Sequence, residues 1–321
     1  MPGRSLFQST VADSISISGI GVHSGLPATV TIHPGDEDTG IVFLRTDLGA
    51  LEREIKAVWS AISTTSLCTV LGDPKDCFVS TVEHLLSALS GLGIDNALIE
   101  IDGPEVPIMD GSAAPFIDAI DGVGLIQQRR RKKALKVLKP VRVEIDGAFG
   151  ELSPAASGCE FDVSLDYDDP SIGQQRYACV LSEETFRLEV SRARTFGFLK
   201  DVETLWAANF AKGSSLENAV VIGDEGVINP EGLRFENEFV RHKLLDAVGD
   251  LSLAGMPLQG RYRSHKGGHR LNFSMLKTLF SDPTAYEIIE ADASSVENRV
   301  RRQRGEVNIN LAAATLRPVT A

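Results

Sequence analysis

The chain has 321 residues, 43% of them hydrophobic, and a formal net charge of −12 at pH 7. This acidic balance argues against general nucleic-acid binding, which needs a large basic surface, and no run approaches the roughly 20 apolar residues of a membrane span. Four cysteines without C-x-x-C spacing, and an N-terminus lacking the apolar core of a signal peptide, predict a cytoplasmic protein with reduced thiols.

The first part of the chain alternates predicted strands with predicted helices. From the period of the apolar residues, strands are expected at 28–32, 40–45 and 96–101, and helices at 79–90 and 114–120. The five basic residues at 129–133 are expected to form a solvated linker rather than a phosphate-binding patch.

The same order recurs after the basic run. Strands are expected at 134–145, 161–167 and 219–222, and helices at 183–190 and 236–253. Because the length exceeds that at which single cores usually stop growing, we expect two α+β domains, at residues 1–128 and 134–282. The charged remainder, 283–321, is expected to be a frayed or partner-binding tail that is too short for a second catalytic module.

The most informative segment is the predicted helix at 236–253. His242, Asp246 and Asp250 follow at four-residue steps, which place their side chains on nearly one helical face. An imidazole and a carboxylate at this spacing can bind one zinc ion, which in a catalytic site needs a third protein ligand and a position open to water. The alternative is an exposed pair that contributes only about 0.2–0.5 kcal/mol.

Glu83 and His84 are a second candidate pair. A Glu beside a metal-ligating His is the arrangement that a metallohydrolase needs, since the carboxylate can take a proton from water at the metal. The competing interpretation is a capping box, in which Glu83, three residues after Ser80, only satisfies the first amide of a helix. The two interpretations place the Glu83 side chain differently.

Two further histidines, His265 and His269, flank a pair of glycines. Adjacent glycines are unfavourable inside a helix, so we do not interpret this H-x-x-x-H spacing as a helical metal clamp. We expect a loop that approaches a ligand, with one histidine free to act as an acid or a cation.

Six segments carry a resemblance to a known family. They are STVEH at 80–84, GIDN at 93–96, PIMDGSAAPF at 107–116, SRARTFGF at 191–198, GLRF at 232–235 and RHKLLDAVGD at 241–250. In these motifs and their order, from about Ser5 to Phe273, the chain resembles the UDP-3-O-acyl-N-acetylglucosamine deacetylases of lipid A synthesis.

The resemblance implies an α+β fold of two similar domains, each a five-stranded sheet packed with two helices, with the active site between the helical layers. It implies zinc-dependent hydrolysis of the 2-acetamido group of UDP-3-O-acyl-N-acetylglucosamine, which gives acetate and UDP-3-O-acyl-glucosamine. The ligands it implies for one zinc ion per chain are His84, His242 and Asp246. It therefore supplies the third ligand that the helix pattern lacks.

Catalytic roles can be assigned on the same basis. Glu83, beside a ligand, is expected to be the general base toward water. The resemblance assigns stabilisation of the oxyanion to Thr195 together with zinc, and protonation of the leaving amine to His269. Asp250 would orient and charge that imidazole, and Lys243 would be a cationic contact at the edge of the site.

Substrate contacts are expected from the resemblance as well. Tyr167 stands where the family has an aromatic residue, usually Phe, that stacks on uracil, and Lys266 is the expected pyrophosphate cation. The residues expected along the acyl-chain tunnel are Phe196, Leu199, Val202 and Val221. The alternative interpretation of the last three is that they are plain core residues.

Two other functions stay open at this point. A zinc hydrolase of a different N-acyl sugar or nucleotide would keep Glu83 and the three ligands but would not need Tyr167 or the tunnel. A nucleotide-sugar binding protein would have the site filled but inert. We expect a cytoplasmic monomer that binds the UDP-sugar, does not bind nucleic acid and has no integral membrane segment. The sequence does not set acyl-chain length, or the choice between zinc and iron.

Overall fold

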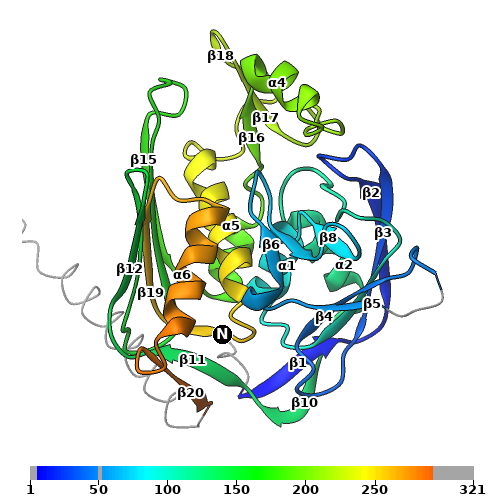
Figure 1. Ribbon diagram of the computed structural model, residues 1–321, viewed down its shortest axis with the longest axis vertical. Coiled ribbons are helices and arrows are strands. Elements are labelled where there is room, and N and C mark those ends of the chain that lie inside the picture. The colour runs from blue at the N-terminus through cyan, green and yellow to red at the C-terminus, as the bar shows by residue number, and fades with distance from the viewer. Residues whose placement is uncertain (1–5, 50–52, 292–321) are drawn as a thin grey trace, which may run out of the picture.

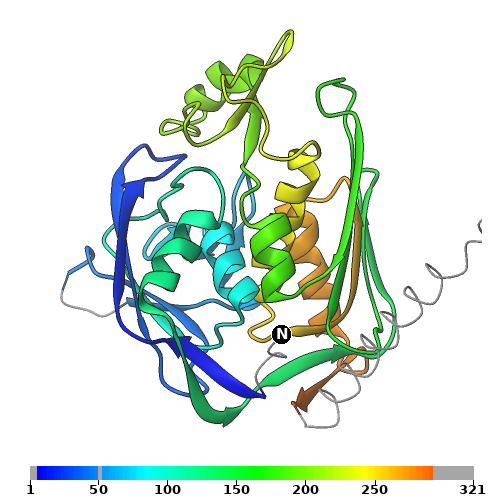
Figure 2. The ribbon, with the colours of Figure 1, turned by 180° about the vertical axis from the view of Figure 1, so that it is seen from behind.

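The computed structural model describes residues 6–49 and 53–291. These residues form four layers, in which two layers of helices lie between two outer sheets (Figure 1). Figure 2 shows the same order of layers from behind. The buried apolar residues of both halves form one continuous cluster across the helices, so the helical interface is part of the core.

The sheet of the first half has the strand order β2-β3-β9-β4-β5. Its strands are β2 (Ile15–Ile20), β3 (Pro27–Pro34), β9 (Ala97–Ile101), β4 (Ile41–Arg45) and β5 (Arg53–Lys56). Val30 pairs with Ile101 and Ile32 with Ile99, and all four are buried, as expected for a sheet with one solvated face. The helices α1 (Glu83–Leu92) and α2 (Ala114–Val123) lie on its inner side (Figure 1).

The second half is built in the same way around a larger sheet. Five strands follow in the order β12-β13-β19-β14-β15, and β11 and β20 extend the sheet from the first residues of β19. Their bounds are β12 (Val141–Ile145), β13 (Ala148–Ser153), β19 (Leu258–His265), β14 (Cys159–Asp166), β15 (Gln174–Val180), β11 (Lys133–Val137) and β20 (Tyr286–Glu290). The helices α5 (Glu238–Ser252) and α6 (His269–Ser281) cover it. The α+β fold is confirmed, with seven strands in this sheet where five were expected.

The helix expected at 79–90 starts later than its pattern suggested. Phe78–Ser80 is strand β8, which pairs with β7 (Val70–Gly72), and β7 pairs in turn with β6 (Ile62–Thr64). The helix begins at Glu83, and its cap residue Val82 makes no side-chain hydrogen bond. Ser80 donates its hydroxyl to the Pro104 carbonyl instead. The capping-box interpretation of Ser80 and Glu83 is therefore wrong, and the Glu83 carboxylate is available for other contacts.

The basic run at 129–133 was expected to be a linker, and this prediction is wrong. Leu125–Arg131 form β10, which pairs antiparallel with β1 (Phe7–Val11), and β11 begins directly afterwards at Lys133. Lys132 lies between the two strands, with its Nζ 2.7 Å from Asp95. Exposed basic side chains are compatible with a two-stranded ribbon because its outer side is solvated.

Other segments differ in detail from the pattern. The expected helix at 183–190 is a short α3 (Glu183–Thr185) continued by the π-turn η2 (Phe186–Val190). Part of the expected tail, Tyr286–Glu290, is strand β20, because its apolar residues pair with β11. From residue 292 onward, the expected tail lies outside the described residues.

One segment stands apart from the four layers. We call residues 196–227 the projecting segment; it extends beyond the helix ends at the top of Figure 1. It contains β16 (Phe196–Phe198), η3 (Leu199–Asp201), α4 (Val202–Ala207), β17 (Val220–Gly223) and β18 (Gly226–Val227). Within the part of the chain described, none of the helices is long and apolar enough to cross a membrane.

Candidate active site

Three potential metal ligands converge between α1 and α5. The Nε2 atoms of His84 and His242 lie 3.5 and 3.3 Å from Oδ1 of Asp246. One ligand atom from each residue lies within 4.8 Å of the other two. The three residues are 4%, 2% and 2% exposed, respectively. They therefore face one another inside the protein, which excludes the exposed-pair interpretation of His242 and Asp246.

The two helices approach unusually closely beside this cluster. A Cβ on Gly249 would lie 2.0 Å from the Glu83 carbonyl oxygen, so only glycine fits at this position. Nearby, the buried Ser87 hydroxyl donates to the Leu245 carbonyl at 2.9 Å. Close helix packing therefore brings the α1 and α5 ligands within reach of one ion.

The hydrogen bonds of His242 determine which ring nitrogen can bind a cation. Nδ1 lies 3.0 Å from the Ala193 carbonyl, which can only accept, so Nδ1 carries the proton. Nε2 then has a free electron pair directed toward Asp246. Burial lowers the pKa of His242 to about 3 in spite of the Asp246 carboxylate. The ring is therefore neutral at physiological pH, as a metal ligand must be.

Asp246 is held in its charged form. Burial would raise its pKa, but His242 and Lys243 outweigh burial and keep the pKa well below its usual range. Oδ2 accepts from Nζ of Lys243 at 3.1 Å, which leaves Oδ1 for another partner. Lys243 thus lies against a proposed ligand as well as at the edge of the site.

The cluster fits a metal ion. Among the described residues, Asp246 Oδ1 is one of three buried side-chain atoms that lack a hydrogen-bond partner, and Nδ1 of His84 is another. A buried carboxylate oxygen is costly to leave unpaired, and here two imidazoles surround it. Two imidazoles and one carboxylate form a donor set that is typical of catalytic zinc.

A second group of charged side chains adjoins the ligands. Nδ1 of His269 is 2.8 Å from Oδ2 of Asp250, and Nε2 is 3.7 Å from Oε1 of Glu83. Burial would lower the pKa of His269, but Asp250 and Glu83 raise it to about 10. Burial raises the pKa of Glu83, against the opposing effect of His269. His269 is therefore protonated at neutral pH, and Glu83 is shifted toward the range of a general base.

The loop that carries Thr195 is attached to both halves. Its amide donates to the Gly111 carbonyl at 2.8 Å, and its carbonyl accepts from Val220 at 2.8 Å. Gly111 has a φ of +84°, and a Cβ there would lie 2.1 Å from the Asn218 carbonyl oxygen. Because the same loop supplies the Ala193 carbonyl to His242, Thr195 lies in a segment that directly adjoins the proposed ligands.

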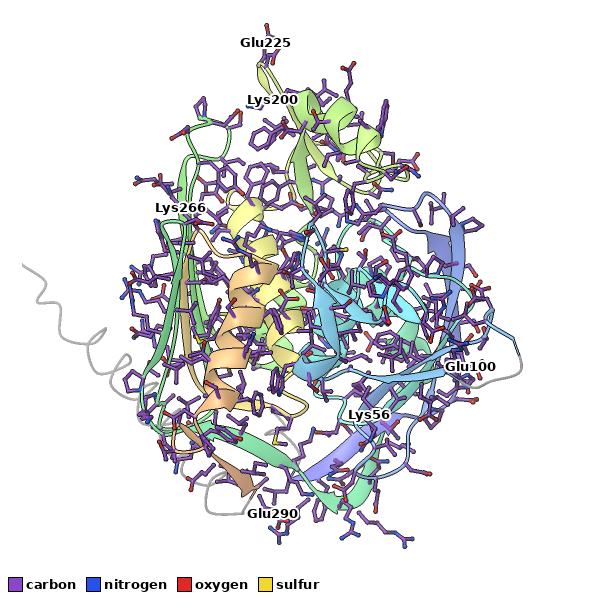
Figure 3. All side chains as sticks on the ribbon, viewed as in Figure 1. Lys56, Glu100, Lys200, Glu225, Lys266 and Glu290 are labelled. Atoms are coloured by element: carbon purple, nitrogen blue, oxygen red, sulfur yellow. The ribbon has the colours of Figure 1, made fainter. Side chains whose placement is uncertain are left out.

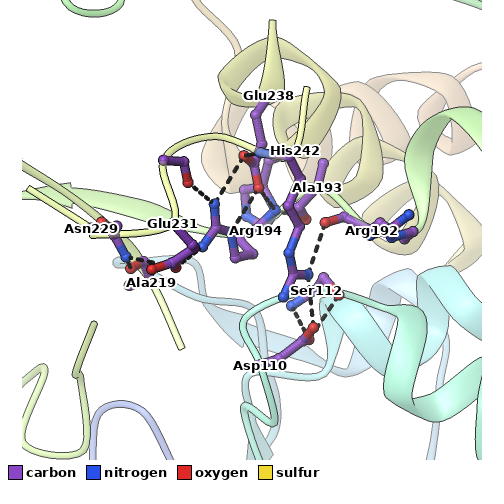
Figure 4. Close-up of polar contacts among 12 residues, drawn as sticks. Asp110, Ser112, Arg192, Ala193, Arg194, Ala219, Asn229, Glu231, Glu238 and His242 are labelled. Carbon is purple, nitrogen blue, oxygen red and sulfur yellow. Dashed lines mark hydrogen bonds and ion pairs between the residues drawn. The ribbon is translucent and has the colours of Figure 1, made fainter. Parts of the chain in front are cut away.

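A buried ion pair fixes this loop to α5 (Figure 4). Arg194, 1% exposed, donates from Nε to Oε1 of Glu238 at 2.9 Å and from Nη2 to Oε2 at 3.2 Å, and Glu238 is fully buried. The Arg194 amide also donates to Glu238 Oε1 at 2.9 Å, and Nη1 lies 2.5 Å from Glu231. Glu238 opens the helix that bears His242, so this pair sets the loop against the ligand helix.

A model of the family described as UDP-3-O-acyl N-acetylglycosamine deacetylase, LpxC, matches residues 8–281. The chain belongs to this family. It is 51% identical over 286 residues to proteins named UDP-3-O-acyl-N-acetylglucosamine deacetylase from Brucella ovis, Brucella abortus and Brucella melitensis. The aligned region covers 89% of this chain and 99% of each relative. The resemblance carried by the six motifs is thereby confirmed as family membership.

The aromatic residues expected at the LpxC substrate site lie together. The Tyr167 ring centroid is 6.1 Å from Phe196 and 6.2 Å from Phe198. Phe196 in turn lies 6.3 Å from the His242 ring, and Nζ of Lys243 is 5.6 Å from the Phe196 centroid. An aromatic cluster therefore connects the proposed uracil contact with the proposed metal ligands.

The remaining expected substrate contacts are more exposed. Leu199 is 52% exposed, and Val202 and Val221 are half-buried in α4 and β17. Lys266 lies at the upper end of the second sheet, where Figure 3 labels it, and its Nζ pairs with Asp166 at 2.9 Å. As expected, Lys266 lies in a loop; it directly follows β19 and has a φ of +54°.

Several contributors to this LpxC-family site were not assigned a role from the sequence. Thr69 contacts two of the charged side chains, and Gly249 permits the close helix approach. Arg194 lies within a quoted motif, and Glu238 within the predicted helix. For Arg194 and Glu238, the only available hint was a charged residue in the core-facing part of its segment. That these two residues pair with each other depends on tertiary structure.

Proposed function

We propose that this chain is a zinc-dependent deacetylase that hydrolyses the 2-N-acetyl group of UDP-3-O-acyl-N-acetylglucosamine in lipid A synthesis. The products would be acetate and UDP-3-O-acyl-glucosamine. The observation that carries the proposal is the buried cluster of His84, His242 and Asp246 next to Glu83 and the His269–Asp250 pair. The deacetylase family and the names of the 51% identical relatives support the choice of substrate.

The proposed zinc would be held by His84, His242 and Asp246. When bound there, the ion would lower the pKa of a water molecule and polarise the amide carbonyl of the substrate. Lys243 would keep Oδ2 of Asp246 occupied, which leaves Oδ1 to the cation. The Ala193 carbonyl would hold the His242 ring in its ligating tautomer.

The protein groups would move two protons during hydrolysis. Glu83 takes one proton as water attacks the carbonyl carbon, and the Thr195 hydroxyl donates to the developing oxyanion. His269 then gives its proton to the sugar nitrogen as the C–N bond breaks, so the amine leaves in neutral form. Asp250 keeps His269 charged and oriented for this step.

Substrate groups would extend from this centre over the aromatic cluster. We propose that Tyr167 stacks on uracil and that Lys266 contacts the pyrophosphate after exchanging its present partner, Asp166. Phe196, Leu199, Val202 and Val221 would line the path of the acyl chain. The ring of Phe196 next to His242 supports a position for the chain close to the scissile bond.

We further propose that the chain acts as a cytoplasmic monomer with two functional domains, residues 1–128 and 134–282. One sheet with its two covering helices in each half supports this division.

Release of acetate from UDP-3-O-acyl-N-acetylglucosamine tests the proposal. The purified protein is assayed before and after chelation, and again with sub-stoichiometric zinc and, separately, ferrous iron. Activity that is lost on chelation and restored by zinc is expected. Equal turnover of a substrate without the 3-O-acyl group would contradict the acyl-binding role of the projecting segment. A folded, zinc-loaded protein that releases no acetate would contradict the reaction itself.

A further inference from the structure

Thr69 joins Glu83, the proposed base, to Asp250, the carboxylate that contacts the proposed acid His269. Its amide donates to Oε2 of Glu83 at 3.0 Å. Its hydroxyl donates to Oδ1 of Asp250 at 2.6 Å. The residue is 1% exposed, so water does not compete for either hydrogen bond.

These contacts close a ring of four residues. Glu83 Oε1 lies 3.7 Å from Nε2 of His269, His269 Nδ1 lies 2.8 Å from Asp250 Oδ2, and Thr69 connects the remaining oxygens of both carboxylates. Thr69 is the only member of the ring without an ionisable side chain. It links the carboxylate that is proposed to take a proton with the carboxylate that contacts the proposed proton donor.

The local fold holds Thr69 rigidly. Strand β7 begins at the next residue, Val70, which pairs with Ser80 of β8, and α1 begins three residues after Ser80, at Glu83. The short β7–β8 hairpin therefore sets Thr69 against the first turn of the helix that carries Glu83. The hydroxyl reaches across to α5 of the other half, where Asn272 of α6 also donates to Asp250, at 2.8 Å.

We infer that Thr69 is a positioning residue that orients Glu83 and Asp250 together, and so sets the geometry of proton transfer for the deacetylation proposed above. The inference rests on that proposed function. A side chain that orients both carboxylates without touching substrate should contribute to turnover rather than to substrate affinity. Outer contacts of this kind typically change activity by about 10–100-fold.

The hydroxyl can be tested separately from the amide. Thr69→Val keeps the shape and the amide donor to Glu83 but removes the donor to Asp250, and Thr69→Ser restores a hydroxyl. Thr31→Val is a matched control because its hydroxyl bonds Ser16 on the outer face of the first sheet. Acetate release, zinc content and thermal unfolding are measured for each variant and for the wild type in one assay.

We expect Thr69→Val to lower kcat by about 10–100-fold with KM changed less than about threefold. Zinc content should stay at one per chain, and Thr69→Ser should recover most of kcat. If Thr69→Val does not fold, Thr69→Ala, which relieves packing, is compared with Thr69→Ser in its place. A wild-type-like kcat, equal losses in the Val and Ser variants, or a loss explained by missing zinc would overturn the inference. Absence of acetate release by the wild type would instead contradict the proposed function.

Discussion

The buried centre and the projecting segment differ in how their residues are positioned. In the centre, His84, His242 and Asp246 are at most 4% exposed and lie on two helices, α1 and α5, that pack closely against each other. In the projecting segment, Leu199 is 52% exposed and lies among short elements of two to six residues. In the centre, close helix packing fixes the positions of side chains that are spaced along a helix. In the projecting segment, the positions of the side chains depend on the loops between short, exposed elements. Substitutions in the centre should therefore have large effects and those in the segment small ones.

The largest effect on stability is expected at the ion pair beneath the centre. Arg194→Met would leave Glu238 charged, fully buried and without its main partner. Breaking a buried pair in this way typically costs about 3–5 kcal/mol. Denaturant unfolding measures the loss. Arg192→Met is the control, because Arg192 is exposed two residues away and should change stability by less than about 0.5 kcal/mol.

A somewhat smaller effect is expected from widening the helix contact. Gly249→Ala would place a methyl group against the Glu83 carbonyl oxygen and push α1 away from α5. Overpacking typically costs about 1–3 kcal/mol, and the ligand distance would increase as well, so zinc affinity should fall with stability. Gly122→Ala in α2 is matched to it, because a Cβ there meets no atom within 4 Å. Equal behaviour of the two variants would show that helix contact does not set the site.

A more selective effect is expected on the pH dependence of turnover. Asp250 and Glu83 overcome burial and raise the pKa of His269 to about 10, so the acid stays protonated up to that pH. Asp250→Asn removes one of the carboxylates that raise the pKa of His269. The decline of kcat on the basic side of the pH profile should therefore move to lower pH. At neutral pH kcat should fall by about 10–100-fold. A pH profile of acetate release measures both quantities, and an unmoved basic limb would exclude His269 as the acid.

The smallest effect is expected in the projecting segment. Leu199→Ser alters a half-exposed side chain, so stability should change by less than about 0.5 kcal/mol. KM for the acylated substrate should rise by only a few-fold, with kcat unchanged, if Leu199 contacts the acyl chain. Steady-state kinetics separates the two parameters. A loss of kcat as large as that of Asp250→Asn would remove the contrast between the two regions.

The sequence was sufficient where one helix carries the information. His242 and Asp246 are four residues apart on α5, and this spacing predicted that they share one helical face, from which they could bind one cation. His84 lies on another helix, and only the resemblance to a family connected it with them. The strands expected at 28–32 and 96–101 are likewise confirmed as β3 and β9.

Sequence reasoning failed where position depends on tertiary contacts. The 79–90 segment has a helical pattern throughout, yet Phe78–Ser80 pairs with β7 because a ladder partner is available. The basic run at 129–133 is mostly exposed, as expected, but most of it forms a strand rather than a linker because β1 lies beside it. Thr69 precedes a three-residue strand and contacts residues 14 and 181 positions away, a relation that no local pattern encodes.

The central claim is that the metal and the base are separate functions of one buried centre. Zinc content and acetate release measured on the same samples of Glu83→Gln and Asp246→Ala test it most directly. Glu83→Gln should retain one zinc per chain and lose about 10²–10⁴-fold in kcat, whereas Asp246→Ala should lose both zinc and activity. Full activity in zinc-loaded Glu83→Gln, or undiminished zinc binding by Asp246→Ala, would contradict the account.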